Sequence, residues 1–307
     1  MEASSWKPIK SFLDNLEPLK PVESSVQEKI RPLQNIRAVV FDIYGTLLIS
    51  DSGGIEQSEM SPKFLSYAFR EANIPLLTKS KDSTDQLLDD ILLMFREKIE
   101  HVHEEKKENN IPFPEINILD IWEQILQHFN EEGKISFFSD SDIRIFSMLF
   151  ELLSNRVYPM PGMKDVLVKL NSMRYPLGII SNAQFYTPLI MNYFLTGNIQ
   201  DKETIKFFEP DITFYSYRLG RAKPDSLAFK DTGEILYEKY GLNTQNILYI
   251  GNDIYNDIYP AKKMGYKTAL FAGDKRSLRL RKDFRILEDI QPDVVIKKLN
   301  SIFDIME

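Results

Sequence analysis

Short apolar runs that end in a polar residue or a loop recur along the chain. The run at 38–42, AVVFD, is apolar up to its last residue, as expected of a strand buried on both faces of a parallel sheet. Further runs of this kind lie at 176–181, 211–216, 246–251, 267–271 and 293–296. Because helical stretches alternate with them, the pattern predicts an α/β fold with a doubly wound, Rossmann-like parallel sheet.

The interval between the first two runs has helical periodicity instead. Ser61 and Pro62 are typical of an N-cap and a first helical position. Four amphipathic stripes follow at helical spacing: Leu65, Ala68, Phe69 and Ala72; Leu87, Ile91, Phe95 and Ile99; Ile118, Trp122, Ile125 and Phe129; Phe146, Leu149, Phe150 and Leu153. We therefore predict an all-α helical cap at residues 55–155, inserted into an α/β core made of residues 36–54 and 156–307.

Residues 1–35 precede the predicted core as an extension. An apolar rhythm from Ile9 to Leu16 and a possible capping box from Ser25 to Glu28 predict one or two short helices. We expect this extension to pack on the main body, with an arm that docks a partner as the alternative. Gly53 and Gly54 lie just before the helical insertion and are candidates for a hinge.

Composition narrows the class of protein. Hydrophobic residues make up 43% of the 307, enough for a buried core, and the net charge of −7 disfavours nucleic acid and anionic membranes as partners. No apolar run approaches the roughly 20 residues that span a bilayer, and the first ten residues lack a signal-like stretch. These features predict a cytoplasmic protein. The basic run 275–285 is interpreted as a solvent-facing patch or as a site for an anion.

The residue inventory also limits the chemistry. The chain has no cysteine and only three histidines, which excludes thiol nucleophiles and cysteine metal sites. His101 and His103 lie two residues apart in a charged stretch; because such residues do not share a helix face, we interpret the stretch as a solvated helix end. Carboxylates, hydroxyls, lysines and backbone groups are left to carry any catalysis.

Polar residues follow the predicted strands at their carboxyl ends, where ligands bind in open α/β sheets. They are Asp42, Tyr44 and Thr46 after the first run, Ser181 and Asn182 after the second, Lys223 after the third, and Asp253 and Asp257 after the fourth. A carboxylate nucleophile, a lysine beside it and hydroxyl or amide groups around an anion make a coherent set. Mg²⁺ prefers oxygen ligands, so Asp42, the backbone carbonyl of Tyr44 and an acid after the fourth run could hold one.

Four motifs resemble the haloacid dehalogenase superfamily, in the subgroup with a helical cap inserted after the first strand. They are FDIYGTLL at 41–48, IISNA at 179–183, AKPD at 222–225 and IGNDIYNDIYPAKKMG at 250–265. The resemblance covers about 36–300 and implies a hydrolase that forms an aspartyl-phosphate or aspartyl-ester intermediate on Asp42, which water then hydrolyses. By this resemblance Asp42, Tyr44 and Lys223 are catalytic, Thr46, Ser181 and Asn182 bind the substrate, and Asp42, Tyr44, Asp253 and Asp257 hold Mg²⁺.

Two departures from the family's phosphatase pattern leave the reaction open. Tyr44 stands where phosphatases usually have an aspartate acid–base, and tyrosine there is similar to the metal-independent haloacid dehalogenases. Asn252 follows Gly251, where an aspartate of the metal site is usual, and Asp253 comes one place later. We predict a magnesium-dependent phosphatase of a small phosphorylated metabolite, with a 2-haloacid dehalogenase or a catalytically weak binding or regulatory protein as alternatives. The substrate and the oligomeric state cannot be predicted from the sequence.

Overall fold

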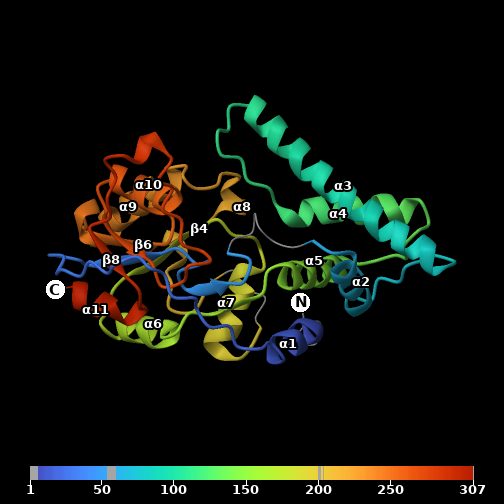
Figure 1. Cartoon of the computed structure of the whole chain (residues 1–307), viewed down its shortest axis with the longest axis horizontal. Helices are drawn as coiled ribbons and strands as arrows, with labels where there is room; N and C mark the ends of the chain where they lie inside the picture. Colours follow the sequence, from blue (N-terminus) through green and yellow to red (C-terminus); the bar gives the residue numbers. More distant parts are fainter. Residues whose placement is uncertain (1–5, 54–59, 200–201, 203, 307) are drawn as a thin grey trace. The chain divides into compact units, whose positions relative to one another are not determined.

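The α/β part of the chain is built on a six-stranded parallel sheet (Figure 1). We describe it from a computed structural model, which covers residues 6–53, 60–199, 202 and 204–306. The strand order is β5-β4-β1-β6-β7-β8. The strands are β1 (Ala38–Phe41), β4 (Leu177–Ser181), β5 (Thr213–Tyr215), β6 (Ile247–Gly251), β7 (Lys267–Phe271) and β8 (Val294–Ile296). Each lies in one of the six apolar runs, so the predicted fold class is confirmed.

The central strand β1 is fully buried because it has a neighbour on each edge and helices over the sheet. Phe41 is in register with Ile179 of β4 and Ile250 of β6. Figure 1 shows the helices α9 (Leu227–Tyr240) and α10 (Tyr259–Lys263) on one side of the sheet. The helices α6 (Met163–Ser172) and α11 (Ile302–Ile305) lie on the other side. A parallel sheet covered in this way brings the carboxyl ends of its strands to one edge.

The chain divides into two compact units. The first contains residues 1–17, 56–156 and 184–203, and the second contains residues 18–55, 157–183 and 204–307. The first unit therefore includes α1 (Lys7–Asp14) and α7 (Thr187–Thr196) in addition to the four helices of the predicted cap. The second unit holds the whole six-stranded sheet.

The helices of the first unit match the four amphipathic stripes. They are α2 (Pro62–Glu71), α3 (Lys81–Glu108), α4 (Ile118–Glu131) and α5 (Asp140–Ser154), and Ser61 caps α2 as predicted. Aromatic rings fill the space between them: Phe95 stacks on Trp122 at 4.3 Å between centroids, and Phe69 lies 4.6 Å from Phe146. The charged stretch that contains His101 and His103 is the last part of α3, as expected.

In its described part, residues 6–35, the N-terminal extension contains one helix, within the one or two that were predicted. The rhythm that begins at Ile9 forms α1, but Ser25 and Glu28 do not start a helix. Residues 18–35 instead run in irregular conformation along the second unit, where Lys29 exchanges two backbone hydrogen bonds with Val295 of β8, at 2.9 and 3.0 Å. The carboxylate of Glu28 accepts from the backbone of Lys297, which uses the group that a capping box would need.

Two short strands were not predicted from the sequence, and Gly53, a predicted hinge residue, is closely packed. β2 (Leu48–Ser50) and β3 (Val157–Pro159) form an antiparallel pair in the second unit, each too short to give an alternating pattern. Gly53 has a φ of +79°, and a Cβ there would lie 2.3 Å from the carbonyl oxygen of Arg276. Gly54, the other hinge candidate, lies outside the described residues.

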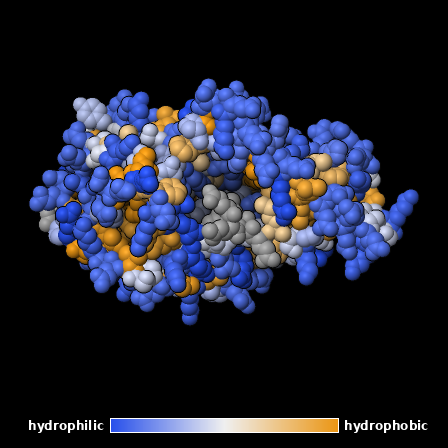
Figure 2. All heavy atoms as spheres, turned by 45° about the horizontal axis from the view of Figure 1, so that its top comes forward, coloured by the Kyte–Doolittle hydropathy of each residue, from blue (hydrophilic) through white to orange (hydrophobic). Residues whose placement is uncertain are grey.

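The basic run 275–285 is bound to the second unit through three of its arginines. Arg276 forms an ion pair with Asp51, Arg279 donates to the carbonyl of Gly53, and Arg281 forms an ion pair with Asp253. On the face shown in Figure 2, hydrophilic side chains predominate and apolar ones form scattered patches. In the part of the chain that the structure describes, no helix combines the length and apolar character needed to cross a membrane.

Candidate active site

Asp42 follows β1 directly and is the centre of a buried polar cluster in the second unit. Its side chain is held through one oxygen: Oδ1 accepts from the hydroxyl of Ser181 at 2.9 Å and from Nζ of Lys223 at 2.7 Å. Oδ2 has a weaker contact, 3.5 Å from the hydroxyl of Thr46. Because charge-assisted hydrogen bonds fix Oδ1, Oδ2 is the oxygen left to react.

The loop after Asp42 turns tightly back toward β2. Gly45 has a φ of +85°, and a Cβ there would lie 2.5 Å from both Nδ2 of Asn252 and Cβ of Ser277. Its amide donates to the carbonyl of Leu48 at 2.7 Å. Only glycine meets both requirements, a left-handed backbone and close approach of a neighbouring loop. The turn brings the hydroxyl of Thr46 back toward Asp42.

Lys223 is the buried cation of the cluster. Besides Asp42, its Nζ atom donates to Oδ1 of Asp257 at 2.5 Å and lies 3.2 Å from the hydroxyl of Tyr249. Burial alone would lower the pKa of the Lys223 ammonium, but the two carboxylates outweigh burial and raise it. Lys223 is therefore a permanent positive charge at neutral pH.

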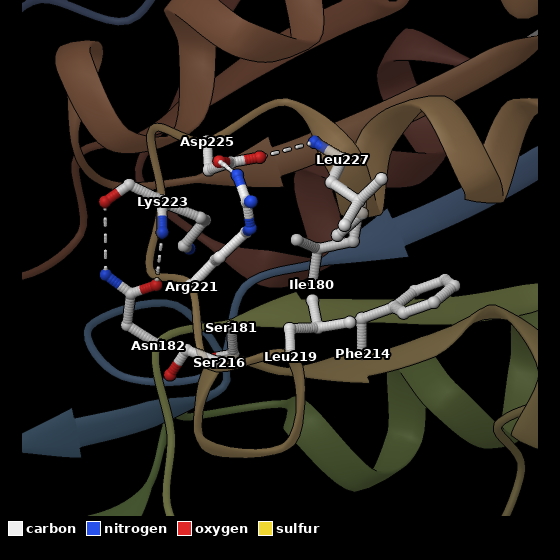
Figure 3. Close-up of a pocket in the computed structure, with 11 residues that line it drawn as sticks. Ile180, Ser181, Asn182, Phe214, Ser216, Leu219, Arg221, Lys223, Asp225 and Leu227 are labelled. Carbon is white, nitrogen blue, oxygen red and sulfur yellow. Dashed lines mark hydrogen bonds and ion pairs between the residues drawn. The ribbon is translucent and has the colours of Figure 1, made fainter. Parts of the chain in front are cut away.

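Asn182 fixes the backbone of the loop that carries Lys223. Figure 3 shows the two residues side by side, with the amide of Lys223 donating to Oδ1 of Asn182 at 2.7 Å. In the same view, Arg221 reaches the carboxylate of Asp225, at 3.1 Å. Asn182 thus orients Lys223 through the main chain, and its role in binding the substrate stays a prediction.

Asp257 lies in a π-helical turn, Ile254–Ile258, that follows β6. Its Oδ2 accepts from the backbone amides of Asn252 and Asp253, both at 2.9 Å, while Oδ1 faces Lys223 and Tyr249. Burial raises the pKa of Asp257 to about 6, and Lys223 opposes that shift. Both oxygens are occupied by donors from the protein itself.

Asp253 and Asn252 face different partners. Asp253 forms an ion pair with Arg281 at 2.7 Å, and its Oδ1 accepts from the amides of Tyr255 and Asn256. Asn252 has its Oδ1 3.3 Å from the hydroxyl of Thr46, which in turn contacts Asp42. Asn252 is therefore connected to Asp42 through Thr46, whereas Asp253 faces the basic run.

The predicted magnesium ligands do not fit a cation as they stand. Asp253 is neutralised by Arg281, and Asp257 is saturated by Lys223 and two amides. Among residues 6–53, 60–199, 202 and 204–306, no cluster of three or more histidine or acidic side chains has the arrangement that would hold a metal ion. The Mg²⁺ assignment to Asp42, Tyr44, Asp253 and Asp257 stays a prediction, and we derive no step through it.

Tyr44 lies on the nucleophile loop and is half-buried. It is close to the fully buried Tyr215 at the end of β5, because Tyr44 and Tyr217 both add to the effect of burial in raising the pKa of the Tyr215 phenol. Tyr215 is in register with Ser181 of β4.

The structure brings most of the predicted residues into one cluster and adds others. Asp42, Thr46, Ser181 and Lys223 are joined by hydrogen bonds, directly or through the Asp42 carboxylate. Tyr249 was not predicted because it lies inside the apolar strand run 246–251 and looks like a core aromatic residue. Arg281 was considered only as part of a basic run, and its pairing with Asp253 has no signal in the local sequence.

The chain was compared with families of known proteins and with solved structures. Residues 36–265 match the family model of the haloacid dehalogenase-like hydrolases. The chain belongs to this hydrolase family. The match spans the predicted nucleophile loop, the helical insertion and the motif after β6, so the resemblance drawn from the four motifs is confirmed at the level of the family.

Two relatives within the family have names that point to different reactions. A glyceraldehyde 3-phosphate phosphatase of Pyrococcus abyssi (strain GE5 / Orsay) is 30% identical over 116 residues, 36% of this chain and 41% of that protein. A crystal structure of a 2-haloacid dehalogenase from Pseudomonas syringae pv. Tomato DC3000 superposes with a TM-score of 0.52 at 17% identity, covering 88% of this chain and 97% of the other. The second likeness concerns the fold alone.

Proposed function

We propose that this hydrolase uses Asp42 as a nucleophile and acts on a small phosphate monoester. The observation that carries the nucleophile is the hydrogen-bonded Asp42 carboxylate, with Oδ1 held by Ser181 and Lys223 and Oδ2 only weakly engaged. The choice of a phosphate ester is supported by the 30% identity with a phosphatase over 116 residues. The substrate class is thus an inference from a partial relative.

In the first step Oδ2 of Asp42 would attack phosphorus. A bond forms between Oδ2 and phosphorus, and the bond to the alcohol oxygen breaks. That oxygen leaves as an alcohol after taking a proton from water, or from the Tyr44 hydroxyl, which water then reprotonates. The Lys223 ammonium and the hydroxyls of Ser181 and Thr46 lie around the carboxylate, where they can hold phosphate oxygens.

In the second step water would hydrolyse the aspartyl phosphate. Attack on phosphorus releases inorganic phosphate and restores the Asp42 carboxylate. Lys223 keeps Oδ1 in place through both steps, because it remains charged and is anchored by Asp257.

A substrate panel tests the proposal. Purified protein is given phosphate monoesters and 2-haloacids, with 5 mM Mg²⁺ or with a chelator (roughly the range in which weak magnesium sites fill), and release of phosphate and halide is measured. Phosphate release that disappears in Asp42→Asn supports the proposal. Halide release without phosphate release contradicts the substrate class but keeps the nucleophile.

A 2-haloacid dehalogenase is the second candidate, and the charge of the site favours it. Within the described residues, Asp42, Asp253 and Asp257 form ion pairs with two cations, Lys223 and Arg281. A phosphate monoester adds a charge of about −2 at neutral pH, whereas a haloacid adds one negative charge through its carboxylate. Tyr44 at the acid–base position points the same way. A binding protein without turnover would release neither product.

A further inference from the structure

The segment Asp274–Arg281, called the arginine loop below, runs beside the residues that follow β6. The amide of Arg279 donates to the carbonyl of Asn252 at 3.0 Å, and the amide of Ile254 donates to the carbonyl of Arg279 at 2.9 Å. Side chains strengthen this backbone pairing at both ends: Ser277 accepts from Asn252, and Arg281 pairs with Asp253. The loop therefore fixes the two neighbouring residues separately.

The carboxylate of Asp253 binds Arg281 of the arginine loop. Its Oδ2 is 2.7 Å from Nη2 and 3.2 Å from Nε of Arg281, a two-pronged contact that suits a guanidinium and a carboxylate. Its Oδ1 accepts two backbone amides of the π-helical turn. The side chain is only 9% exposed, so moving it away would break the ion pair with Arg281 and two hydrogen bonds from backbone amides.

Asn252 is oriented toward the nucleophile by the same loop. Its Nδ2 donates to the carbonyl of Ser277 at 2.6 Å, which directs the amide oxygen toward Thr46 at 3.3 Å. Thr46 in turn lies 3.5 Å from Oδ2 of Asp42. The oxygen of Asn252 is therefore placed beside the reactive carboxylate, but it carries no charge.

We propose that Asn252, not Asp253, is the residue of this motif that faces a cation at Asp42, and that the arginine loop makes the site a weak one for divalent ions. Because Mg²⁺ and Mn²⁺ bind carboxylates more strongly than amides, a neutral ligand here lowers affinity. A single change, Asn252→Asp, would place a second carboxylate beside Asp42. This inference concerns binding alone and does not depend on whether the substrate is a phosphate ester.

Titration with Mn²⁺, followed by the electron paramagnetic resonance signal of the free ion, tests the assignment. We expect the wild type to bind in the millimolar range or not measurably, and Asn252→Asp to bind at least about tenfold more tightly. Asn171→Asp, which adds a carboxylate on the exposed end of α6, is the matched control and should behave as the wild type. Tight binding by the wild type, or no gain in a folded Asn252→Asp protein, would overturn the proposal.

Asp253→Asn gives an independent answer if Asn252→Asp does not fold. When Asp253 serves only the arginine loop, this variant keeps the Mn²⁺ affinity of the wild type within about twofold. If Asp253 is a ligand, any measurable affinity of the wild type falls at least about tenfold, and the assignment is wrong. The same Mn²⁺ titration is repeated with Mg²⁺ in about 20-fold excess. Weaker apparent Mn²⁺ binding in the presence of Mg²⁺ shows that both ions share the site.

Discussion

The hydroxyl of Tyr249 lies 3.2 Å from Nζ of Lys223. Tyr249 belongs to β6, which pairs with β1, the strand before Asp42. The same hydroxyl donates to the carbonyl of Ile180 at 2.9 Å and lies 3.1 Å from Oδ1 of Asp257. One phenol thus connects β4, β6 and the buried ion pairs. Burial raises the pKa of the Tyr249 phenol well above its usual range, and the nearby carboxylates of Asp257 and, to a smaller extent, Asp42 add to the effect. The phenol therefore stays protonated.

Tyr249→Phe should therefore make the Lys223 side chain more mobile without changing its charge. The variant loses the hydroxyl but keeps the ring, and we expect unfolding free energy to fall by about 1–2 kcal/mol because a buried carbonyl and a carboxylate lose a partner. Turnover should drop several-fold. Urea denaturation and steady-state kinetics measure the two effects. Tyr237→Phe, at an exposed tyrosine, is the control and should be neutral in both.

Asp42→Asn should abolish turnover and leave a folded protein. The amide has the shape of the carboxylate but is not a nucleophile. Lys223 keeps its ion pair with Asp257 in this variant, so the buried ammonium is not left without a carboxylate. Turnover and circular dichroism are compared with those of Asp283→Asn, which removes an exposed carboxylate. More than a few per cent of residual activity would contradict the nucleophile assignment.

Glu151 predicts a pH-dependent stability of the helical unit. Burial raises the pKa of this α5 carboxyl to about 7, opposed by the hydroxyl of Tyr186, which donates at 3.2 Å. Since the native protein holds the proton more tightly than the unfolded chain, stability falls as pH rises from about 4.5 to 7.

Glu151→Gln removes this titration. Above pH 7 the variant should be about 1–2 kcal/mol more stable than the wild type, less than the full shift implies because the side chain keeps some contact with water. Unfolding free energies at pH 5, 6, 7 and 8 (roughly spanning the shifted range) measure it. Glu123→Gln, at an exposed position of α4, should leave the profile unchanged, and parallel profiles for all three proteins would refute the role of Glu151.

Tyr44 makes a prediction about the leaving group. A phenol can donate a hydrogen bond to the leaving oxygen, but it is a poor base for the attacking water. If the substrate is a phosphate ester, aryl and acyl phosphates should react far faster than alkyl phosphates. Tyr44→Asp should raise the rate on alkyl phosphates selectively.

A plot of log rate against leaving-group pKa tests this role. The wild type should give a steep slope, and Tyr44→Asp a flatter one. Tyr44→Phe serves as control, because it keeps the ring and removes the hydroxyl. Equal slopes for wild type and Tyr44→Asp would mean that Tyr44 only packs beside the site.

The six strands of the parallel sheet could be predicted from apolar runs, because a strand that is buried on both faces needs apolar residues at consecutive positions. The edge rule for such sheets also placed Asp42, Ser181 and Lys223 together before any geometry was known. The rule does not distinguish Asn252 from Asp253, since adjacent residues of one loop can face opposite partners. That choice is made by Arg281, 28 residues along the chain, and pairing at such a distance leaves no local trace.

The backbone pairing of Lys29 with Val295 has a consequence for the solution behaviour of the chain. β8 is the outermost strand on its side of the sheet, and an outer strand with open amides and carbonyls is a template for other chains. Residues 18–35 occupy part of that edge. A shortened protein that begins at residue 36 would retain all six strands and the Asp42 cluster. It would, however, expose the unpaired backbone amides and carbonyls of β8, to which other chains could bind. Oligomers and precipitation at high concentration, rather than lost catalysis, would then be the first sign of the deletion.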